Sequence, residues 1–164
     1  MFKKYFYSYF SVLCLACIFF SSKSNNSSPD LSFPIRENFS FSSLYCYRTL
    51  GNYHFHNGVD VPKSFGTPIY ALSSGTVSYI GFLSSYGNTI VISYYNQYKS
   101  LYGHTSGIYS FKVGDSVSSS DIVAYVGPKY LSSGALNGFT TGPHLHFTLY
   151  YKGKVIDPLS IKYS

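Results

Sequence analysis

Glutamate is almost missing from this chain of 164 residues, in which Glu37 is the single example. Glutamate favours helices, whereas tyrosine and phenylalanine, which together supply a 20% aromatic content, favour strands. Glycine is also frequent, with 14 residues. This composition argues against long amphipathic helices and predicts a mainly β fold.

Cysteine is nearly absent from the part of the chain that can form a globular domain. Two of the three cysteines lie within the first 20 residues, so Cys46 stands alone if that leader is removed. A single cysteine cannot form an internal disulfide, even in an oxidising compartment. In the run 44–48, Cys46 alternates with its neighbours as strand residues do. This predicts a buried small side chain and leaves a role as metal ligand as the less favoured alternative.

Acidic residues are few, since 6 Asp+Glu stand against 12 Lys+Arg, a formal charge of +6. Lys3 and Lys4 belong to the leader, so residues 21–164 carry 10 basic and 6 acidic side chains, or +4. The basic residues are scattered, which gives no reason to expect a nucleic-acid partner. The modest excess suits residence near anionic polymers such as cell wall or lipid headgroups. No obligate protein partner is evident.

No apolar run is long enough to be a convincing membrane span. Two lysines precede an apolar segment over residues 5–20, which is shorter than the ~20 residues that a spanning helix needs. A positive start, a short apolar run and a polar flank are typical of a secretory signal. We interpret residues 1–22 as a signal peptide or membrane anchor. The alternatives, in order, are cleavage near residues 22–24, lipidation at Cys17, and an uncleaved anchor.

The composition changes between residues 30 and 41. Residues 21–30 carry almost no apolar side chain, which is typical of a flexible tether. From Phe33 onward the chain becomes aromatic, so the domain is expected to start between Leu31 and Phe41. We assign residues 23–35 to a flexible linker and residues 36–164 to a single domain.

Short apolar and β-branched runs recur through this domain, separated by turns that contain glycine or asparagine. They predict strands at 67–72, 75–80, 88–94, 122–126 and 144–150, with a further strand that reaches His104. Strands at such spacing indicate a single compact antiparallel β-sheet domain.

Histidine is the residue type that carries chemistry here, because four of the five histidines fall into three short clusters. The clusters are His56 with Asp60, Tyr102-Gly-His104, and His144 with His146. Residues two apart in a strand point to the same face, so His144 and His146 place two imidazoles side by side. His56, Asp60 and one member of that pair match the three ligands of a catalytic zinc, which keeps a fourth position for water.

Three blocks of sequence resemble the signature motifs of the lysostaphin/LytM-type zinc metallopeptidases. They are His56-x-Gly-Val-Asp60, Tyr102-Gly-His104 and Gly142-Pro-His-Leu-His-Phe147. The surrounding sequence is similar as well, at 66–71, at 86–88 and at Asp157-Pro158. The resemblance therefore runs in order from Arg48 to Leu159.

This resemblance implies an antiparallel β-sheet core with loops that form a groove, and one zinc ion held by His56, Asp60 and His146. It also implies an endopeptidase that cuts peptide cross-links or stem peptides of bacterial peptidoglycan. Such a protein is exported to the periplasm or cell envelope of a bacterium, and a membrane-anchored or lipidated form stays open. The alternative is a non-catalytic adaptor of the same fold that binds wall or activates an amidase.

Histidine is the candidate residue type for general acid–base catalysis. Proteases of the His-Glu-x-x-His kind use a glutamate, but Glu37 lies in the expected entry segment. The resemblance implies that His104 and His144 lie beside the metal-bound water. An imidazole pKa of about 6.5 suits both general acid–base catalysis and stabilisation of the oxyanion, and the sequence does not say which residue does which.

Several neighbouring positions are predicted less directly. The candidates for substrate contact are Asn52, Tyr53 and Tyr102. His54 is expected at a surface or supporting position, and Thr148 stands where the family commonly has an acidic residue. The loop 128–141 is longer than typical, and we expect it to form one wall of the groove.

Overall fold

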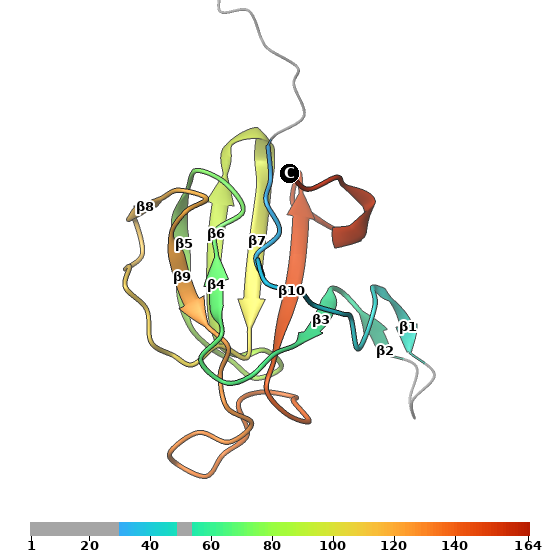
Figure 1. Ribbon diagram of the computed structural model, residues 1–164, viewed down its shortest axis with the longest axis vertical. Helices are drawn as coiled ribbons and strands as arrows, with labels where there is room; N and C mark the ends of the chain where they lie inside the picture. The colour runs from blue at the N-terminus through green and yellow to red at the C-terminus, as the bar shows by residue number, and fades with distance from the viewer. Residues whose placement is uncertain (1–29, 49–53) are drawn as a thin grey trace, which may run out of the picture.

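The computed structural model describes residues 30–48 and 54–164 (Figure 1). The predicted signal peptide or anchor, most of the predicted linker, and Asn52 and Tyr53 lie outside the described residues. The described chain is mainly strands and loops, which confirms the predicted fold class. The elements are β1 (Cys46–Arg48), β2 (His54–His56), β3 (Val59–Pro62), β4 (Pro68–Tyr70), β5 (Gly75–Leu83), β6 (Gly87–Tyr94), η1 (Tyr95–Gln97), β7 (Tyr98–Gly103), β8 (Ser116–Val117), β9 (Ile122–Tyr125), β10 (His144–Tyr151), β11 (Lys154–Ile156) and η2 (Pro158–Ser160).

Strand β10 lies at the centre of the pairings in a seven-stranded sheet (Figure 1). The strand order is β11-β10-β7-β6-β5-β8, and β3 also pairs with β10. The first half of β10 therefore lies between β3 and β7, and its second half between β11 and β7. Two separate two-stranded sheets are formed by β1 with β2 and by β4 with β9. All pairings among the described strands are antiparallel, as predicted.

The two faces of β10 differ, because alternate residues of a strand point to opposite sides. Leu145 and Phe147 are fully buried and belong to the hydrophobic core. His144 and His146 alternate with them and therefore point to the opposite face. One strand thus builds the core on one side and presents both histidines on the other.

The core lies between the large sheet and the β4–β9 pair, which Figure 1 shows in front of β5 and β6. Both layers contribute fully buried apolar side chains, among them Ile69, Val123 and Ala124 from the pair, and Val77, Ile90 and Ile92 from the large sheet. Burial of this surface is the main stabilising contribution to the fold.

Core residues begin at Leu31, which is within the expected range of 31–41 for the domain start but before the assigned boundary at residue 36. Leu31 and Ile35 are 1% and 2% exposed and belong to the core. A backbone hydrogen bond from Ser164 N to Leu31 O also joins this segment to the C-terminal end. The apolar side chains of residues 31–35 complete the core, so this part of the predicted linker is folded domain.

Cys46 is exposed, contrary to the buried position predicted from its alternation. It pairs with His56 in the β1–β2 sheet, outside the seven-stranded sheet. A two-stranded sheet gains burial only where another layer covers it, so a strand-like pattern there does not ensure a buried side chain. Nor does Cys46 belong to the group of possible metal ligands in the described chain.

Tyr102 does not face the groove, and its predicted substrate contact is wrong. It lies opposite Phe147 in the β7–β10 register and is fully buried, with the two ring centroids 5.8 Å apart. Its hydroxyl group forms a hydrogen bond of 3.0 Å with the hydroxyl of Tyr94. Alternation along β7 places Tyr102 on the core face, although it is close in sequence to His104.

The predicted strands are present, with small shifts, as β4, β5, β6, β7, β9 and β10. Their partners follow no simple order in the sequence, since β4 and β5 are consecutive but belong to different sheets. The short strands β2, β3, β8 and β11 were not predicted. None of the helices in the described ranges is long and apolar enough to cross a membrane.

Leu31→Ala should lower the free energy of unfolding by about 2–5 kcal/mol, because truncation of a buried leucine leaves a cavity. Phe65→Ala, at a side chain that is 61% exposed, should change it by less than about 0.5 kcal/mol. Urea unfolding of the wild type and both variants measures these effects. If both variants changed the free energy of unfolding by the same small amount, residue 31 would belong to the linker rather than to the core.

Candidate functional site

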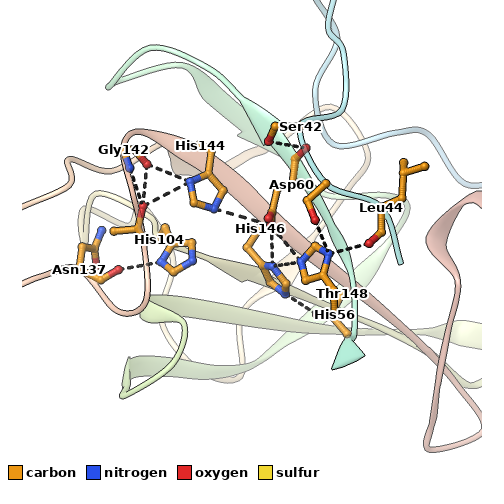
Figure 2. A network of polar contacts seen from close by, with 12 residues as sticks. Ser42, Leu44, His56, Asp60, His104, Asn137, Gly142, His144, His146 and Thr148 are labelled. Atoms are coloured by element: carbon orange, nitrogen blue, oxygen red, sulfur yellow. Dashed lines mark hydrogen bonds and ion pairs between the residues drawn. The ribbon is translucent and has the colours of Figure 1, made fainter. Parts of the chain in front are cut away.

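Asp60 and His146 are direct partners in the register of β3 and β10. Strand β2 brings His56 to the same point (Figure 2). His146 Nδ1 lies 2.8 Å from Asp60 Oδ1, and His56 Nε2 lies 3.1 Å from both of these atoms. Three residues predicted as ligands therefore converge from three strands.

The outer nitrogen of each imidazole ring has a hydrogen-bond partner, which bears on which ring nitrogen carries the proton. His56 Nδ1 donates to Leu44 O at 2.8 Å, and His146 Nε2 lies 2.9 Å from Thr148 Oγ1, where either atom can be the donor. A neutral imidazole has a single N–H, so His56 Nε2 then carries a lone pair, and His146 Nδ1 carries one when its Nε2 is the donor to Thr148. In that state two nitrogen lone pairs and a carboxylate oxygen face one point, which is the arrangement that binds a cation.

The arrangement fits a zinc ion. Zinc binds histidine nitrogen and carboxylate oxygen at about 2.0–2.2 Å with tetrahedral geometry, which separates ligand atoms by about 3.3 Å. Burial alone would raise the pKa of Asp60, but hydrogen bonds and charges from His146 and His56 lower it below its usual range. Burial lowers the pKa of His146. Both effects favour the states that bind metal, an ionised carboxylate and a neutral imidazole.

Gly58 permits the convergence because it has no side chain. A Cβ at this position would lie 2.4 Å from Phe147 O and 3.0 Å from the ring of His146. The φ of Gly58 is not in the positive region, so a left-handed turn is not the reason for glycine here. Its role is instead to let the β2–β3 connection approach β10 closely.

His104 and His144 form a second pair beside these three residues, with ring centroids 4.6 Å apart (Figure 2). His104 Nδ1 donates to Asn137 O at 2.7 Å, and His144 Nδ1 donates to Gly142 O at 2.9 Å. Each ring therefore keeps its Nε2 free of these backbone contacts. His144 Nε2 lies 3.7 Å from Asp60 Oδ1, so it faces the same centre.

The backbone of His104 is strained, and hydrogen bonds hold both its N–H group and its carbonyl group. Its φ of 56° is in the left-handed region, which residues other than glycine rarely adopt. Its N–H donates to Tyr86 O at 2.6 Å, and its carbonyl accepts from Gly127 N at 2.8 Å. Strain of this kind clusters at functional sites. Burial also lowers the pKa of His104 to about 4, so the ring is neutral at pH 7.

An open groove of about 490 Å³ gives access to both groups. One wall includes Arg48 and Phe55 from the β1–β2 sheet, and the other includes Phe139 and Thr141. The Phe139 side chain is 80% exposed. The long loop 128–141 therefore forms part of one wall, as predicted.

Several groove residues were missed by sequence reasoning, among them Arg48 and Tyr86. Arg48 is one of the scattered bases in the sequence, yet its Nη2 lies 2.7 Å from Asp60 Oδ2. The ring of Tyr86 lies 5.2 Å from that of His146. The similarity at 86–88 was an available signal for Tyr86, whereas no pattern singles out Arg48. The side chain of His54 lies outside what the structure describes.

Thr148→Val should weaken zinc binding by about tenfold to a hundredfold, because the outer hydrogen bond of a histidine ligand orients its ring and selects its tautomer. Thr89→Val is the matched control, since Thr89 is also fully buried but its hydroxyl donates to Gly87 O. Competition with a chromophoric chelator measures both affinities. Equal affinities would mean that Thr148 does not orient His146.

The metal-free protein should lose stability as the pH falls from about 6.5 to about 4. In the unfolded chain His104 takes up a proton near the ordinary pKa of 6.5, whereas burial lowers the pKa to about 4 in the folded protein. Protons therefore favour unfolding in this window, by an amount on the order of 3 kcal/mol. His104→Gln should flatten this part of the curve in urea unfolding at a series of pH values. An unchanged slope would contradict the assignment.

Comparison with known proteins places these residues in a family. The sequence profile described as Peptidase family M23 matches residues 54–158. The chain is similar to DD-carboxypeptidase/endopeptidase Mpg of Neisseria meningitidis serogroup B, with 31% identity over 73% of this chain and 26% of the relative. It is also similar to peptidoglycan DD-endopeptidase ShyA of Vibrio cholerae, with 33% identity over 63% of this chain and 22% of the relative. The chain spans about a quarter of the length of these relatives.

Solved structures agree with this match. A zinc containing peptidase from Vibrio cholerae has a TM-score of 0.69 and 25% identity, over 83% of this chain and 41% of that one. The catalytic domain of lysostaphin from Staphylococcus simulans has a TM-score of 0.63 and 30% identity, over 75% of this chain and 91% of that one. These findings confirm the resemblance to the lysostaphin type, and the chain belongs to peptidase family M23.

Proposed function

We propose that this protein is a zinc-dependent endopeptidase that hydrolyses peptide cross-links or stem peptides of bacterial peptidoglycan. The observation that carries the proposal is the convergence of two imidazole nitrogens and one carboxylate oxygen on a point beside two further histidines in an open groove. The names of the relatives support the reaction class, since one is a peptidoglycan DD-endopeptidase. A substrate in the cell wall also implies export to the bacterial envelope.

In this proposal His56, Asp60 and His146 hold one zinc ion. Zinc bound there would supply a Lewis acid for the scissile carbonyl and would lower the pKa of a bound water. The ligand set has three protein groups, which is the number that catalytic zinc sites use when one position stays open.

His104 and His144 carry out the proton transfers in this scheme. Because each Nδ1–H is bound to a backbone carbonyl, each Nε2 is the atom that can accept or donate a proton at the groove. His104 is neutral at pH 7 and so can act as a base. A protonated Nε2 can then donate a hydrogen bond to the oxyanion or a proton to the leaving amine. Water adds to the carbonyl carbon, the C–N bond breaks, and a carboxylate and an amine are formed.

Digestion of purified peptidoglycan by the zinc-loaded full-length protein tests the proposal. We expect new amino termini, loss of the reaction with a chelator, and recovery on addition of zinc. His146→Ala should lose both zinc and turnover. His104→Ala should keep zinc but lose turnover by about 10²–10⁴-fold, because a general acid–base group contributes about that much.

Phe65→Ala serves as the control, since Phe65 is exposed and does not line the groove. Muropeptides from each digest, separated by mass, identify the bond that is cut. Binding to peptidoglycan without release of amino termini, in the presence of bound zinc, would overturn catalysis and favour the non-catalytic adaptor.

A further inference from the structure

Arg48 lies directly behind the proposed metal centre. Its Nη2 donates to Asp60 Oδ2 at 2.7 Å, while the other oxygen of this carboxylate faces His56 and His146. The guanidinium group also lines the groove at the end of β1. If the scissile bond of a substrate lies at the proposed metal centre, a substrate group that contacts Arg48 must therefore belong to a residue that flanks this bond.

The guanidinium group has capacity for a further partner. Arginine offers five N–H donors in a planar fork. In the described part of the chain, Asp60 is its one recorded side-chain partner, and Nε has none. The Arg48 side chain is 34% exposed but its Nε is buried, so the N–H groups left for a ligand in the groove are those on the two terminal nitrogens.

The charge of the groove selects for an anion. Among the described residues that line it, Asp60 is the one carboxylate and Arg48 is the one arginine or lysine, so these two charges cancel. A divalent ion at the centre then leaves a net charge of +2. A cleft of one sign attracts ligands of the opposite sign and disfavours neutral ones.

We propose that Arg48 is a specificity-determining residue that binds a free α-carboxylate on the amino acid that supplies the leaving amine. The inference rests on the proposed function and narrows its substrate class. On the acyl side of a scissile amide, the carboxyl group of the flanking residue is consumed in the bond itself. On the amine side, the α-carboxyl is free wherever the chain ends or a cross-link enters through a side-chain amine. Arginine binds such a carboxylate through two parallel hydrogen bonds.

The substrates are therefore amide bonds next to a free carboxylate, rather than bonds within a continuous main chain. Hydrolysis leaves this carboxylate unchanged and releases it on the amine product. A role in which Arg48 only orients Asp60 would affect all substrates equally. Selectivity between matched substrates separates the two roles.

Two synthetic cross-link mimics test the inference. Each joins the carbonyl of D-alanine to the amine on the D-centre of a diaminopimelate residue, and the neighbouring α-carboxyl is either free or converted to a carboxamide. We expect the wild type to prefer the free acid by about tenfold to a hundredfold in kcat/KM, which corresponds to one charge-assisted hydrogen bond. Arg48→Gln should lose most of this preference, and Arg48→Lys should keep part of it.

Arg36→Gln is the matched control. It removes the same charge from a residue that stacks on Tyr70 and lies outside the groove lining. Its preference should equal that of the wild type. Zinc content of all variants, measured by elemental analysis, shows whether a loss of rate reflects a loss of metal.

Equal rates of the wild type on both mimics would overturn the inference. So would an equal loss on both mimics in Arg48→Gln, which would assign Arg48 a positioning role only. If the wild type cleaves neither mimic nor peptidoglycan, the proposed function fails. Calorimetric binding of the two mimics to the zinc-loaded protein then decides the inference, and equal affinities would overturn it.

Discussion

The close approach of three polar atoms, which the fold brings within about 3 Å of one another, is the constraint on which this structure depends. The atoms stay together because they are attached to strands that cannot move apart. Asp60 lies between Val59 and Val61, and His146 lies between Leu145 and Phe147, all of which are fully buried. Separation of the two strands would expose these four side chains to water, at about 1.5–3 kcal/mol each. The hydrophobic core therefore holds the polar centre in a geometry that is ready for a cation.

The same sheet determines what surrounds that centre. Each inward nitrogen depends on an outward hydrogen bond, and the acceptors are backbone carbonyls for His56, His104 and His144 but a threonine hydroxyl for His146. Carbonyl oxygens cannot donate a hydrogen bond, so they select a single tautomer. A hydroxyl can reverse its role, which makes His146 the ligand whose tautomer depends most on the identity of one side chain.

Part of this arrangement follows from sequence. The spacing of His144 and His146 is enough to place both imidazoles on one face, because the period of a strand is two. The pairing of Asp60 with His146 cannot be predicted from sequence in this way, since 86 residues separate them and no local pattern specifies which strands pair. Only the resemblance to a family indicated it. Strand alternation also explains two errors, because it does not reveal whether a second layer covers Cys46 or which face of β7 carries Tyr102.

The assigned boundary at residue 36 lies after the first core residues for a different reason. Residues 31–35 follow a long polar stretch, and a few apolar residues there carry little weight in composition, although Leu31 and Ile35 are core residues. Arg48 was missed because its sequence context gives no signal. An isolated basic residue has no distinctive sequence context, and its position beside Asp60 depends on the β1–β2 pairing and on the approach of Ser43 to Asp60.

The hydrogen bond between Leu31 and Ser164 brings the beginning of the described domain next to the end of the chain, close to where β10 finishes. The histidines lie where β10 begins, at the other end of an eight-residue strand about 26 Å long (Figure 1). A fluorescent reporter, a solid support or a second binding module joined at the C-terminal end, or at residue 30 where the described domain begins, would thus be attached remote from the groove. Large polymeric ligands would meet the open end of the molecule without steric obstruction by the attached group.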